Sequence, residues 1–412
     1  MKKSIYILLI IIVILLLPQF FGLNRNCGPK KSNVVFWTLQ MGTFSNYINN
    51  IINEFESQNP NIHIVWVDVP YSEGEKRTLA AILSNNPPDL VNLTPDFSIL
   101  LAQRKALYII PESYIKEYSP SITNVLKKDD GYFAFPFYVT SALTFYNKDL
   151  YEKSKITKVP ATYDELYSLA QQTKKLTNSF VTMPTLTEND TFLKILNKYN
   201  INTPDTINSQ KSIEIFNKYQ YLYKNNLIPK ESITQTHREA LEKYMAGQIV
   251  FLPAGANFLN IIKENAPKVF SDTEVTNQLV GETGKYDFSL MNLVIPKRSK
   301  NTEASVKFAL FLTNKKNQLE LAKLTTILPA NKEALNDEYF TSIDNNDIFS
   351  KARVISANQL NNIQPMVQAS SNQKELLSLI NNYVQQIVLE KGDTKTLLDN
   401  LCNSWRKLYK PQ

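Results

Sequence analysis

Histidine, cysteine and glycine are scarce in this chain. Its 412 residues include two histidines, two cysteines and 10 glycines. Neither His63 nor His237 has a cysteine or histidine neighbour at the spacing of metal ligands, so we expect no zinc site. Cys402 is expected to be a small buried hydrophobic residue rather than half of a disulfide. The few glycines argue against long flexible tethers between domains.

Sequence signatures of several enzyme classes are also absent. The chain has no Gly-x-x-x-x-Gly-Lys phosphate loop, no Gly-x-Gly-x-x-Gly turn and no Gly-x-Ser-x-Gly nucleophile elbow. Paired carboxylates of a glycosidase can lie far apart in sequence, so a hydrolase stays open as an alternative. We expect no catalytic activity, no cofactor and no metal ion.

Length and composition indicate a globular protein of two lobes. A chain of 412 residues exceeds the size of one ordinary core. Hydrophobic residues make up 43% and charged residues 20%, which is typical of folded proteins. The net charge is +7, but removing five basic residues of an acid-free N-terminal segment leaves 7 − 5 = +2. These five basic residues are Lys2, Lys3, Arg25, Lys30 and Lys31. Because the remaining net charge is small, nucleic acid is not an expected partner.

Residues 1–32 are predicted to be a targeting leader. A basic start precedes an apolar run over residues 5–17, as in secretory signals. Cys27 follows shortly afterwards and would be acylated in a lipoprotein, although Asn-Arg-Asn precedes it where small residues are usual. The alternative is an uncleaved anchor, because residues 5–23 approach the roughly 20 needed to span a bilayer. Either leader tethers the protein outside the cytoplasm.

Residues 34–96 alternate between apolar strands and amphipathic helices. Strands are predicted at 34–37, 62–69 and 90–93, and helices at 44–55 and 79–83. Such alternation favours a parallel sheet with crossover helices. In these sheets ligands bind beyond the carboxyl ends of the strands. The predicted site therefore lies in the loops after Trp37, Val69 and Leu93.

The rest of the chain mixes helices and strands less regularly, so the predicted fold class is α/β. An Asp130-Gly131 turn indicates a hairpin. Further strands are predicted at 141–147, 249–252 and 288–295. Helices are predicted at 97–107, 163–176, 192–199, 209–225, 237–245, 303–312, 317–324 and 375–409.

Polar and aromatic side chains gather where the predicted strands end. Aromatic faces beside hydroxyl, amide and carboxylate groups suit a hydroxyl-rich ligand such as a sugar. Simple structural roles remain open: Trp37 and Tyr138 could be core residues, Phe97 could begin a helix, and Asp96 could cap it. The candidates are Trp37, Gln40, Met41, Thr94, Asp96, Phe97, Tyr138 and Thr140.

Six stretches taken together resemble the extracellular solute-binding proteins of bacterial ABC importers, in the maltose-binding-protein-like group. Each stretch is loose alone, but their order and spacing over residues 33–412 are specific. They are Val-Val-Phe-Trp at 34–37; Ile-Asn-Glu-Phe-Glu at 52–56 with Asn-Pro-Asn-Ile at 59–62; Pro-Asp-Leu-Val-Asn at 88–92; 131–137 with 145–150; Tyr-Met-Ala-Gly-Gln at 244–248; and Ile-Pro-Lys at 295–297 leading to Leu-Pro-Ala at 328–330.

The resemblance implies a two-lobe periplasmic-binding-protein-like fold of type II, with mixed, mainly parallel sheets flanked by helices and a cleft between the lobes. It places residues 33–139 and 293–355 in lobe 1, and residues 140–292 and 356–412 in lobe 2. Ligand contacts are then expected from the loops at 37–42 and 94–97, from Tyr138 and Thr140, and from a region near Gly255 and Asn257.

Two departures from the family pattern weaken the expectation of maltodextrin as ligand. Relatives carry a Gly-Pro-Trp-like motif where this chain has Gly255-Ala256-Asn257, so an aromatic platform is missing. Maltodextrin binders carry a carboxylate at the first crossing, where this chain has Thr140.

The function implied is that of the extracytoplasmic substrate-binding component of an ABC importer. A small hydroxyl-rich solute, above all a sugar or sugar derivative, would bind in the cleft of a monomer and pass to a membrane permease. Two alternatives from other classes remain: a cell-surface polysaccharide hydrolase and a ligand-sensing surface lipoprotein.

Overall fold

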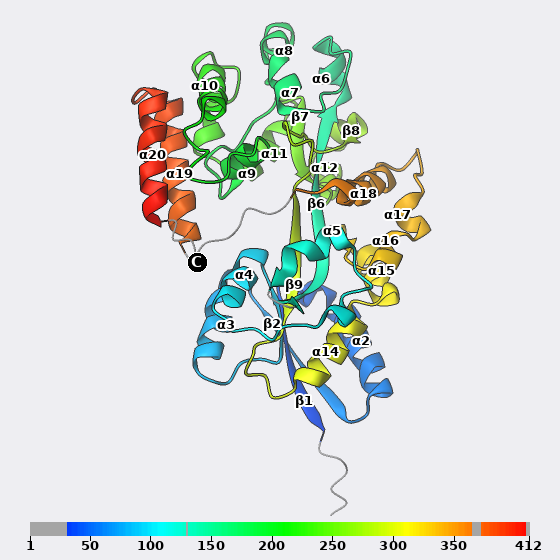
Figure 1. The fold of residues 1–412 in the computed structure, drawn as a ribbon. Coiled ribbons are helices and arrows are strands. Elements are labelled where there is room, and N and C mark those ends of the chain that lie inside the picture. Colours follow the sequence, from blue (N-terminus) through cyan, green and yellow to red (C-terminus); the bar gives the residue numbers. More distant parts are fainter. Residues whose placement is uncertain (1–30, 129–130, 365–371, 409–412) are drawn as a thin grey trace, which may run out of the picture.

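The protein folds as two α/β lobes joined by strands that run from one lobe into the other (Figure 1). The structure is a computed structural model and describes residues 31–128, 131–364 and 372–408. Residues 1–30 of the predicted leader, including Cys27, lie outside these residues. The first strand begins at the end of lobe 1 that is farthest from lobe 2 (Figure 1).

The N-terminal block has the predicted alternation of strands and helices. Strands β1 (Ser32–Leu39), β2 (Ile62–Val69) and β3 (Leu90–Leu93) are parallel, with β1 between the other two. Their apolar residues form strands because helices cover both faces of the sheet. The intervening helices are α2 (Ser45–Gln58) and α3 (Gly74–Leu83), and α4 (Pro95–Gln103) follows β3. These predictions are confirmed.

The large sheet is mixed, in the order β10-β6-β9-β3-β1-β2. Its parallel pairings are those of β1 with β2 and with β3, and the remaining strands pair antiparallel. The antiparallel strands are β6 (Phe135–Asn147), β7 (Phe251–Gly255), β8 (Thr273–Thr276), β9 (Phe288–Val294) and β10 (Leu328–Pro329). The short strands β4 (Lys127–Lys128) and β5 (Gly131–Tyr132) form the predicted hairpin; Asp130 of its turn lies outside the described residues.

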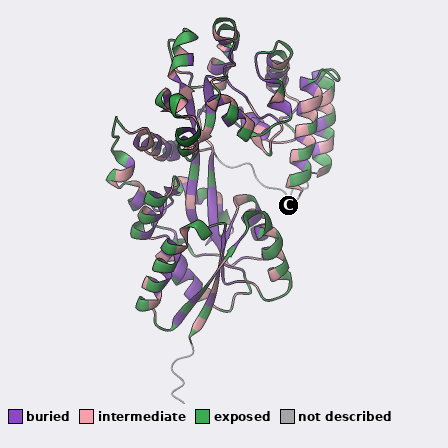
Figure 2. Ribbon diagram, turned by 180° about the vertical axis from the view of Figure 1, so that it is seen from behind, coloured by how far each residue is buried: buried purple, intermediate pink, exposed green. Residues whose placement is uncertain are grey.

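Strand β6 belongs to both lobes. Its residues 135–141 pair with β9, which also runs between the lobes (Figure 1), and its residues 142–147 pair with β7 and β8 in lobe 2. The sequence predicted a hairpin that ends at residue 137 and a separate strand from residue 141, whereas the structure has one continuous strand from Phe135 to Asn147. Seen from behind, the strands that join the lobes are buried along most of their length (Figure 2).

A buried glutamine ties the crossing segments together. Gln359, at the end of α18 (Ile348–Gln359), donates from Nε2 to Ser141 Oγ at 3.0 Å and to the Ala142 carbonyl at 2.9 Å. Its Oε1 accepts from the Gln278 backbone N–H at 2.7 Å. The Gln278 side chain in turn bonds both the N–H and the carbonyl of Asp287, directly before β9. The network thus fixes β6, β9 and α18 relative to one another.

Separate hydrophobic clusters fill the lobes. In lobe 1, Phe308 is fully buried and packs edge-on against Phe36 and Phe55, with ring centroids 5.3 and 5.0 Å apart. In lobe 2, Phe192 packs against Phe216 and Tyr219. Helix α18 contacts the core of lobe 1 through Ala357 and a core of lobe 2 through Ala352. The lobe boundaries given above therefore stay a prediction.

The other predicted helices are present, except that residues 163–176 and 375–409 each form two helices and not one. Helices α12 and α18 were not predicted from the sequence. Cys402 is buried, as predicted, and donates to the Pro204 carbonyl. The main helices are α7 (Tyr163–Ser168), α8 (Ala170–Thr177), α9 (Thr191–Asn197), α10 (Gln210–Lys224), α11 (His237–Met245), α12 (Phe258–Asn265), α14 (Thr302–Leu312), α15 (Lys315–Leu324), α17 (Glu338–Thr341), α19 (Gln373–Val388) and α20 (Thr394–Leu408).

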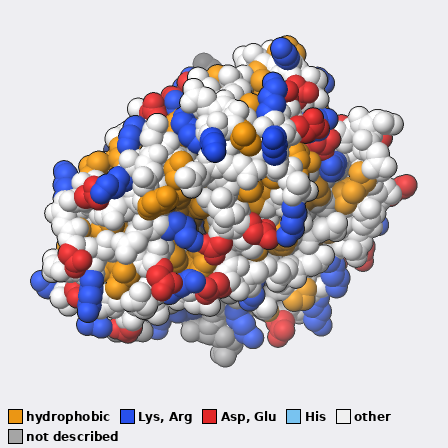
Figure 3. All heavy atoms as spheres, turned by 90° about the horizontal axis from the view of Figure 1, so that it is seen from above, with side chains coloured by type: hydrophobic (Ala, Val, Ile, Leu, Met, Phe, Trp, Pro, Cys, Tyr) orange, Lys and Arg blue, Asp and Glu red, His pale blue; other side chains and the backbone are white. Residues whose placement is uncertain are grey.

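The surface of lobe 2 carries charges of both signs. Viewed from above, basic and acidic side chains are interspersed over this face (Figure 3). Among the described residues, no helix combines the length and the apolar character that crossing a bilayer requires.

Replacing Phe308 by alanine should destabilise lobe 1. Loss of a fully buried aromatic ring leaves a cavity, and the expected cost is about 3–5 kcal/mol in the free energy of unfolding. Urea unfolding followed by circular dichroism measures this cost. Leu83→Ala, at a side chain that is 72% exposed on α3, should change stability by less than about 0.5 kcal/mol. Equal effects of the two variants would contradict the packing described.

Candidate functional site

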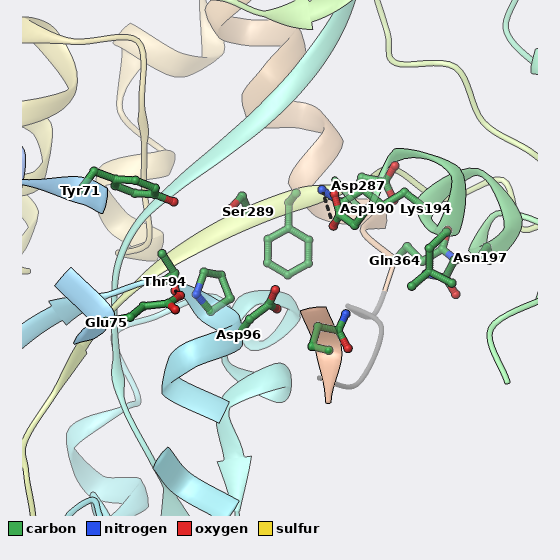
Figure 4. Close-up of a pocket in the computed structure, with 14 residues that line it drawn as sticks. Tyr71, Glu75, Thr94, Asp96, Asp190, Lys194, Asn197, Asp287, Ser289 and Gln364 are labelled. Carbon is green, nitrogen blue, oxygen red and sulfur yellow. Dashed lines mark hydrogen bonds and ion pairs between the residues drawn. The ribbon is translucent and has the colours of Figure 1, made fainter. Parts of the chain in front are cut away.

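A cavity of about 280 Å³ lies between the lobes. Residues of its two walls face each other across the gap (Figure 4). Both lobes therefore contribute side chains to one cleft. The lining residues are Tyr71, Glu75, Thr94, Pro95, Asp96, Asp190, Leu193, Lys194, Asn197, Asp287, Phe288, Ser289, Gln364 and Gln373.

The lobe 1 wall is built at the carboxyl ends of β2 and β3. Tyr71 and Glu75 follow β2, in the turn before α3 and in the first turn of that helix. Thr94 and Asp96 follow β3, where Pro95 begins α4. Thr94 Oγ1 lies 3.4 Å from Glu75 Oε1, so the two loops are in contact. Ligand sites in open α/β sheets are expected at this edge.

The lobe 2 wall comes from the start of α9 and the start of β9. Asp190 precedes α9, and Lys194 follows one turn later and forms an ion pair with Asp190 Oδ2 at 3.0 Å. Asp287 and Ser289 flank the first residue of β9. The wall therefore presents carboxylate, ammonium and hydroxyl groups to lobe 1.

Opposing charges meet across this cavity. The Asp96 side chain is exposed and makes no hydrogen bond or ion pair with other described residues. Its pKa is raised above the ordinary value, mainly by desolvation and then by the negative charge of Asp190, while Lys194 acts in the opposite direction. Desolvation disfavours the charge on Lys194, but Asp190, then Asp287 and Asp96, outweigh it and raise the Lys194 pKa. The cavity thus holds a cation among carboxylates.

A buried lysine supports the lobe 2 wall from behind. Lys198 is 1% exposed, and its ammonium group lies 2.8 Å from Asp287 Oδ2 and 3.1 Å from Gln278 Oε1. Desolvation lowers the pKa of Lys198, and attraction by Asp287 opposes that effect. Removing either partner would leave the other charge buried and unpaired. Asp287 is therefore held at the cavity by the same network that fixes the crossing strands.

One ion pair also bridges the two lobes at the rim. Lys374, in the first turn of α19, lies 3.6 Å from Glu75 Oε2. Its side chain is 89% exposed, so this pair contributes little to stability. The contact shows that the lobes approach each other on this side of the cleft.

The donors and acceptors of the cavity suit the hydroxyl groups of a ligand. Carboxylates accept hydrogen bonds from hydroxyls, Lys194 donates, and Ser289 and Thr94 do both. Tyr71, whose side chain is a largely exposed aromatic, adds an apolar ring face. No group of three or more histidine, cysteine or acidic residues within the described ranges is arranged to hold a metal.

Comparison with known proteins identifies the family. The family model of the bacterial extracellular solute-binding proteins matches residues 42–319, more than half of the chain. The chain belongs to this family. Membership implies a location outside the cytoplasm and a binding function.

Some relatives of this solute-binding protein are similar over nearly its full length and others over about a third of it. A Brucella abortus protein assigned as a binding protein is 24% identical over 404 residues, or 91% of this chain and 92% of that relative. The multiple sugar-binding protein of Streptococcus mutans is 27% identical over 130 residues, which cover 31% of this chain and 30% of the relative. A structure from Synechococcus sp. MITs9220, assigned as an oligosaccharide periplasmic-binding protein, has a TM-score of 0.81, 27% identity, and coverage of 91% of this chain and 98% of its own.

Four of the residues predicted for the site lie in or beside the cavity. Thr94 and Asp96 line it. Thr140 is the cross-strand partner of Ser289, which also lines it. Tyr138 is half-buried on β6, and its pKa is raised to about 12, chiefly by burial and to a lesser degree by Tyr71.

Met41 and Phe97 do not line the cavity, contrary to their prediction as ligand contacts. Both are buried in the lobe 1 core, Met41 with 5% and Phe97 with 7% of its surface exposed. Trp37 is half-buried within β1 and packs beside Leu39 and Val69. Gln40 is exposed in the following loop, and it adopts a left-handed backbone with φ of 52°.

The loop after β1 has its own anchor, which the sequence did not reveal. Asp68, in the paired strand β2, accepts from Thr38 Oγ1 at 2.7 Å and from the backbone N–H groups of Met41 at 2.9 Å and Gly42 at 2.8 Å. This aspartate fixes the path of the loop at the lobe 1 side of the cleft.

Gly255 and Asn257 lie away from this cavity. Gly255 ends β7 and pairs with Ala142, and a side chain at this glycine would meet Asn257 Oδ1 at 2.6 Å. Asn257 lines a second cavity between the lobes.

The lobe 2 wall is the part of the site that sequence reasoning missed. Asp190 and Lys194 belong to a polar helix start, and Asp287 precedes an apolar strand, so each is ordinary in its local context. The i, i+4 spacing of Asp190 and Lys194 was the one visible signal, and it indicates only a helix-surface ion pair.

The replacement Asp96→Asn should stabilise the protein at neutral pH. Because the folded-state pKa of Asp96 is raised, its charged form destabilises the folded state above that pKa, and this penalty is absent once pH falls below the unfolded-state pKa. The variant should therefore melt higher than the parent near pH 7, and the difference should vanish toward about pH 3.

Thermal unfolding between these pH values measures the difference. Glu152→Gln, at an exposed acid on α6 (Lys148–Lys153) far along the chain from the cavity, serves as the charge-matched control. A difference that persists unchanged at the acidic end would contradict the electrostatic cause.

Proposed function

We propose that this solute-binding protein holds a sugar or a similar hydroxyl-rich solute between its lobes and delivers it, as a monomer, to the permease of an ABC importer. The observation that carries the proposal is the cavity itself, to which both lobes contribute polar side chains beside an exposed tyrosine. The names of the Streptococcus and Synechococcus relatives, which refer to sugars and oligosaccharides, support the same solute class.

Closure follows from contacts made with both walls. A ligand shifts the balance between open and closed lobes only by as much as it prefers one of them. A solute can form hydrogen bonds to both walls at once only when the lobes are closed. Its hydroxyls would then bond to Thr94 and Asp96 on one side and to Lys194 and Ser289 on the other. The closed form would then dock on the permease, and no bond of the solute need change.

The charges of the cavity favour a neutral solute there. Among the described residues, four carboxylates line the space, those of Glu75, Asp96, Asp190 and Asp287, against one lining cation, Lys194. A phosphate or carboxylate placed among them would meet net repulsion. Independently of charge, the missing aromatic platform at Asn257 and the threonine at position 140 argue against a maltodextrin.

Tethering by the leader completes the proposed role. A secretory leader with acylation at Cys27, or an uncleaved anchor, would keep the protein at the membrane where its permease resides. We infer that lobe 1 takes residues 33–139 and 293–355 and that lobe 2 takes residues 140–292 and 356–412, with α18 spanning the boundary.

Neutral mono- and oligosaccharides should bind without being converted. A ligand at 100 times its Kd raises the stability of the folded state by about 2.7 kcal/mol, so a thermal-shift screen over such sugars should find a hit, and calorimetry should show saturable binding. Asp96→Asn should weaken that binding at least tenfold, because a charged acceptor for a sugar hydroxyl is lost.

Since the same variant is expected to be more stable without ligand, weaker binding cannot be ascribed to unfolding. Glu152→Gln again provides the control and should bind normally. Release of product from an oligosaccharide would point instead to the hydrolase, and unchanged affinity in Asp96→Asn would remove this cavity as the site.

A further inference from the structure

A second cavity between the lobes has a different character from the first. Its volume is about 430 Å³. Phe44 and Tyr339 of lobe 1 line it, together with Asn257, which directly precedes α12, and Arg353 of α18. The two cavities flank the shared strand β6. Ser289 of the first lies on β9, Ile327 of the second directly precedes β10, and these strands pair with opposite edges of β6.

The arginine in this cavity is held in place before any ligand arrives. Arg353 Nε donates to the Tyr339 carbonyl at 2.6 Å, and its guanidinium carbon lies 3.7 Å from the centroid of the Tyr339 ring. Stacking and one hydrogen bond fix the plane of the group. The remaining N–H donors make no hydrogen bond with other described residues. A fixed guanidinium with free donors is suited to binding carboxylate or phosphate.

A buried hydroxyl in the same wall lacks a partner. Ser356 lies one helical turn after Arg353 and is 3% exposed. Its Oγ makes no hydrogen bond within the described part of the chain, although the residue lines the cavity. A buried polar atom without a partner is costly, and such atoms usually bond to a water or a ligand. The hydroxyl therefore offers a ready donor or acceptor for a solute in the cavity.

The charge of the lining is uniformly positive. Lys323 and Arg353 line the cavity, and none of the described residues that line it is an aspartate or a glutamate. A third cation, Lys263, lies 5.6 Å from the ring centroid of Phe349, another lining residue. The first cavity, in contrast, is dominated by carboxylates. An anion would therefore be repelled from the first cavity and attracted to the second.

We propose that the second cavity is a binding subsite for the oxyanion of a hydroxyl-rich solute, either the carboxylate of a sugar acid or the phosphate of a sugar phosphate. Arg353 and Lys323 bind the oxyanion, Ser356 and Asn257 bind neighbouring oxygens, and the rings of Phe44 and Phe349 border the space that the sugar ring occupies. The proposal rests on the proposed function, since a solute held there is likewise held between the lobes.

Calorimetry with matched sugars tests the subsite. Glucose and galactose, their uronates and their 6-phosphates are titrated into the purified protein at constant ionic strength, with inorganic phosphate as a separate probe. At least one uronate or sugar phosphate should bind tenfold or more tightly than its neutral parent. The uronate and phosphate arms distinguish the two sources of the oxyanion.

Three variants locate the binding. Arg353→Gln and Lys323→Gln should each weaken binding of the anionic sugar at least fivefold and leave the neutral sugar unaffected. Ser356→Ala should also weaken it severalfold, yet its melting temperature should stay the same or rise, because an unpaired buried hydroxyl is removed. Lys315→Gln, at an exposed lysine on the same helix as Lys323, should change nothing.

The outcomes separate this inference from the proposed function. If neutral sugars bind and their anionic forms bind no more tightly, the subsite is overturned and the proposed function stands. If Ser356→Ala and Lys323→Gln leave anionic binding unchanged, the subsite is likewise overturned, even should Arg353→Gln fail to fold. Inorganic phosphate binding as tightly as the sugar phosphates would mean an adventitious ion only. If no sugar of either kind binds, both proposals fail.

Discussion

The amide of Gln359 holds the point on which the two-lobe arrangement depends. At Ser141 and Ala142, β6 leaves its partner in lobe 1 and takes new partners in lobe 2, and the glutamine bonds both residues at that point. A backbone that changes sheet partners exposes donors and acceptors, and these cannot stay unpaired in a buried place. The side chain supplies the missing bonds and links them to Gln278 and Asp287.

The same constraint positions the candidate site. Asp287 is fixed from behind by Gln278 and by the buried ammonium of Lys198, so a cavity carboxylate is part of the structure that joins the lobes. Charge on the cavity wall and the geometry of the crossing are therefore coupled. A change at Lys198 would alter both, although this residue does not line the cavity.

The local parts of the fold were readable from the sequence, and the long-range parts were not. Strands β1 to β3 and their helices follow from apolar runs ended by Asn59-Pro60 and Pro87-Pro88, because each signal lies within a few residues. The length of β6 was missed because Pro136 and the polar residues near Thr140 interrupt its apolar pattern. Only pairing with β9 keeps that stretch extended.

In the candidate site, too, the residues that follow from local sequence signals were predicted, and those that depend on long-range packing were not. Thr94 and Asp96 were found because strand ends in a parallel sheet share one edge. The same rule also selected Met41 and Phe97, which are buried in the lobe 1 core, because the end of a strand does not fix which side chains point toward the cleft. Asp190, Lys194 and Asp287 come from segments almost 100 residues apart that meet only after lobe 2 has folded. Nothing in their local sequence distinguishes them from surface charges.

The position of Ser32 has a mechanical consequence. Strand β1 starts at the tip of lobe 1, at the pole opposite lobe 2, and the crossings lie at the far end of that lobe (Figure 1). A membrane tether attached ahead of Ser32 would hold lobe 1 in a fixed position at the membrane. Lobe 2 could then move over the cleft without displacing the tethered end of lobe 1. Capture of a solute and attachment to the membrane would therefore not compete.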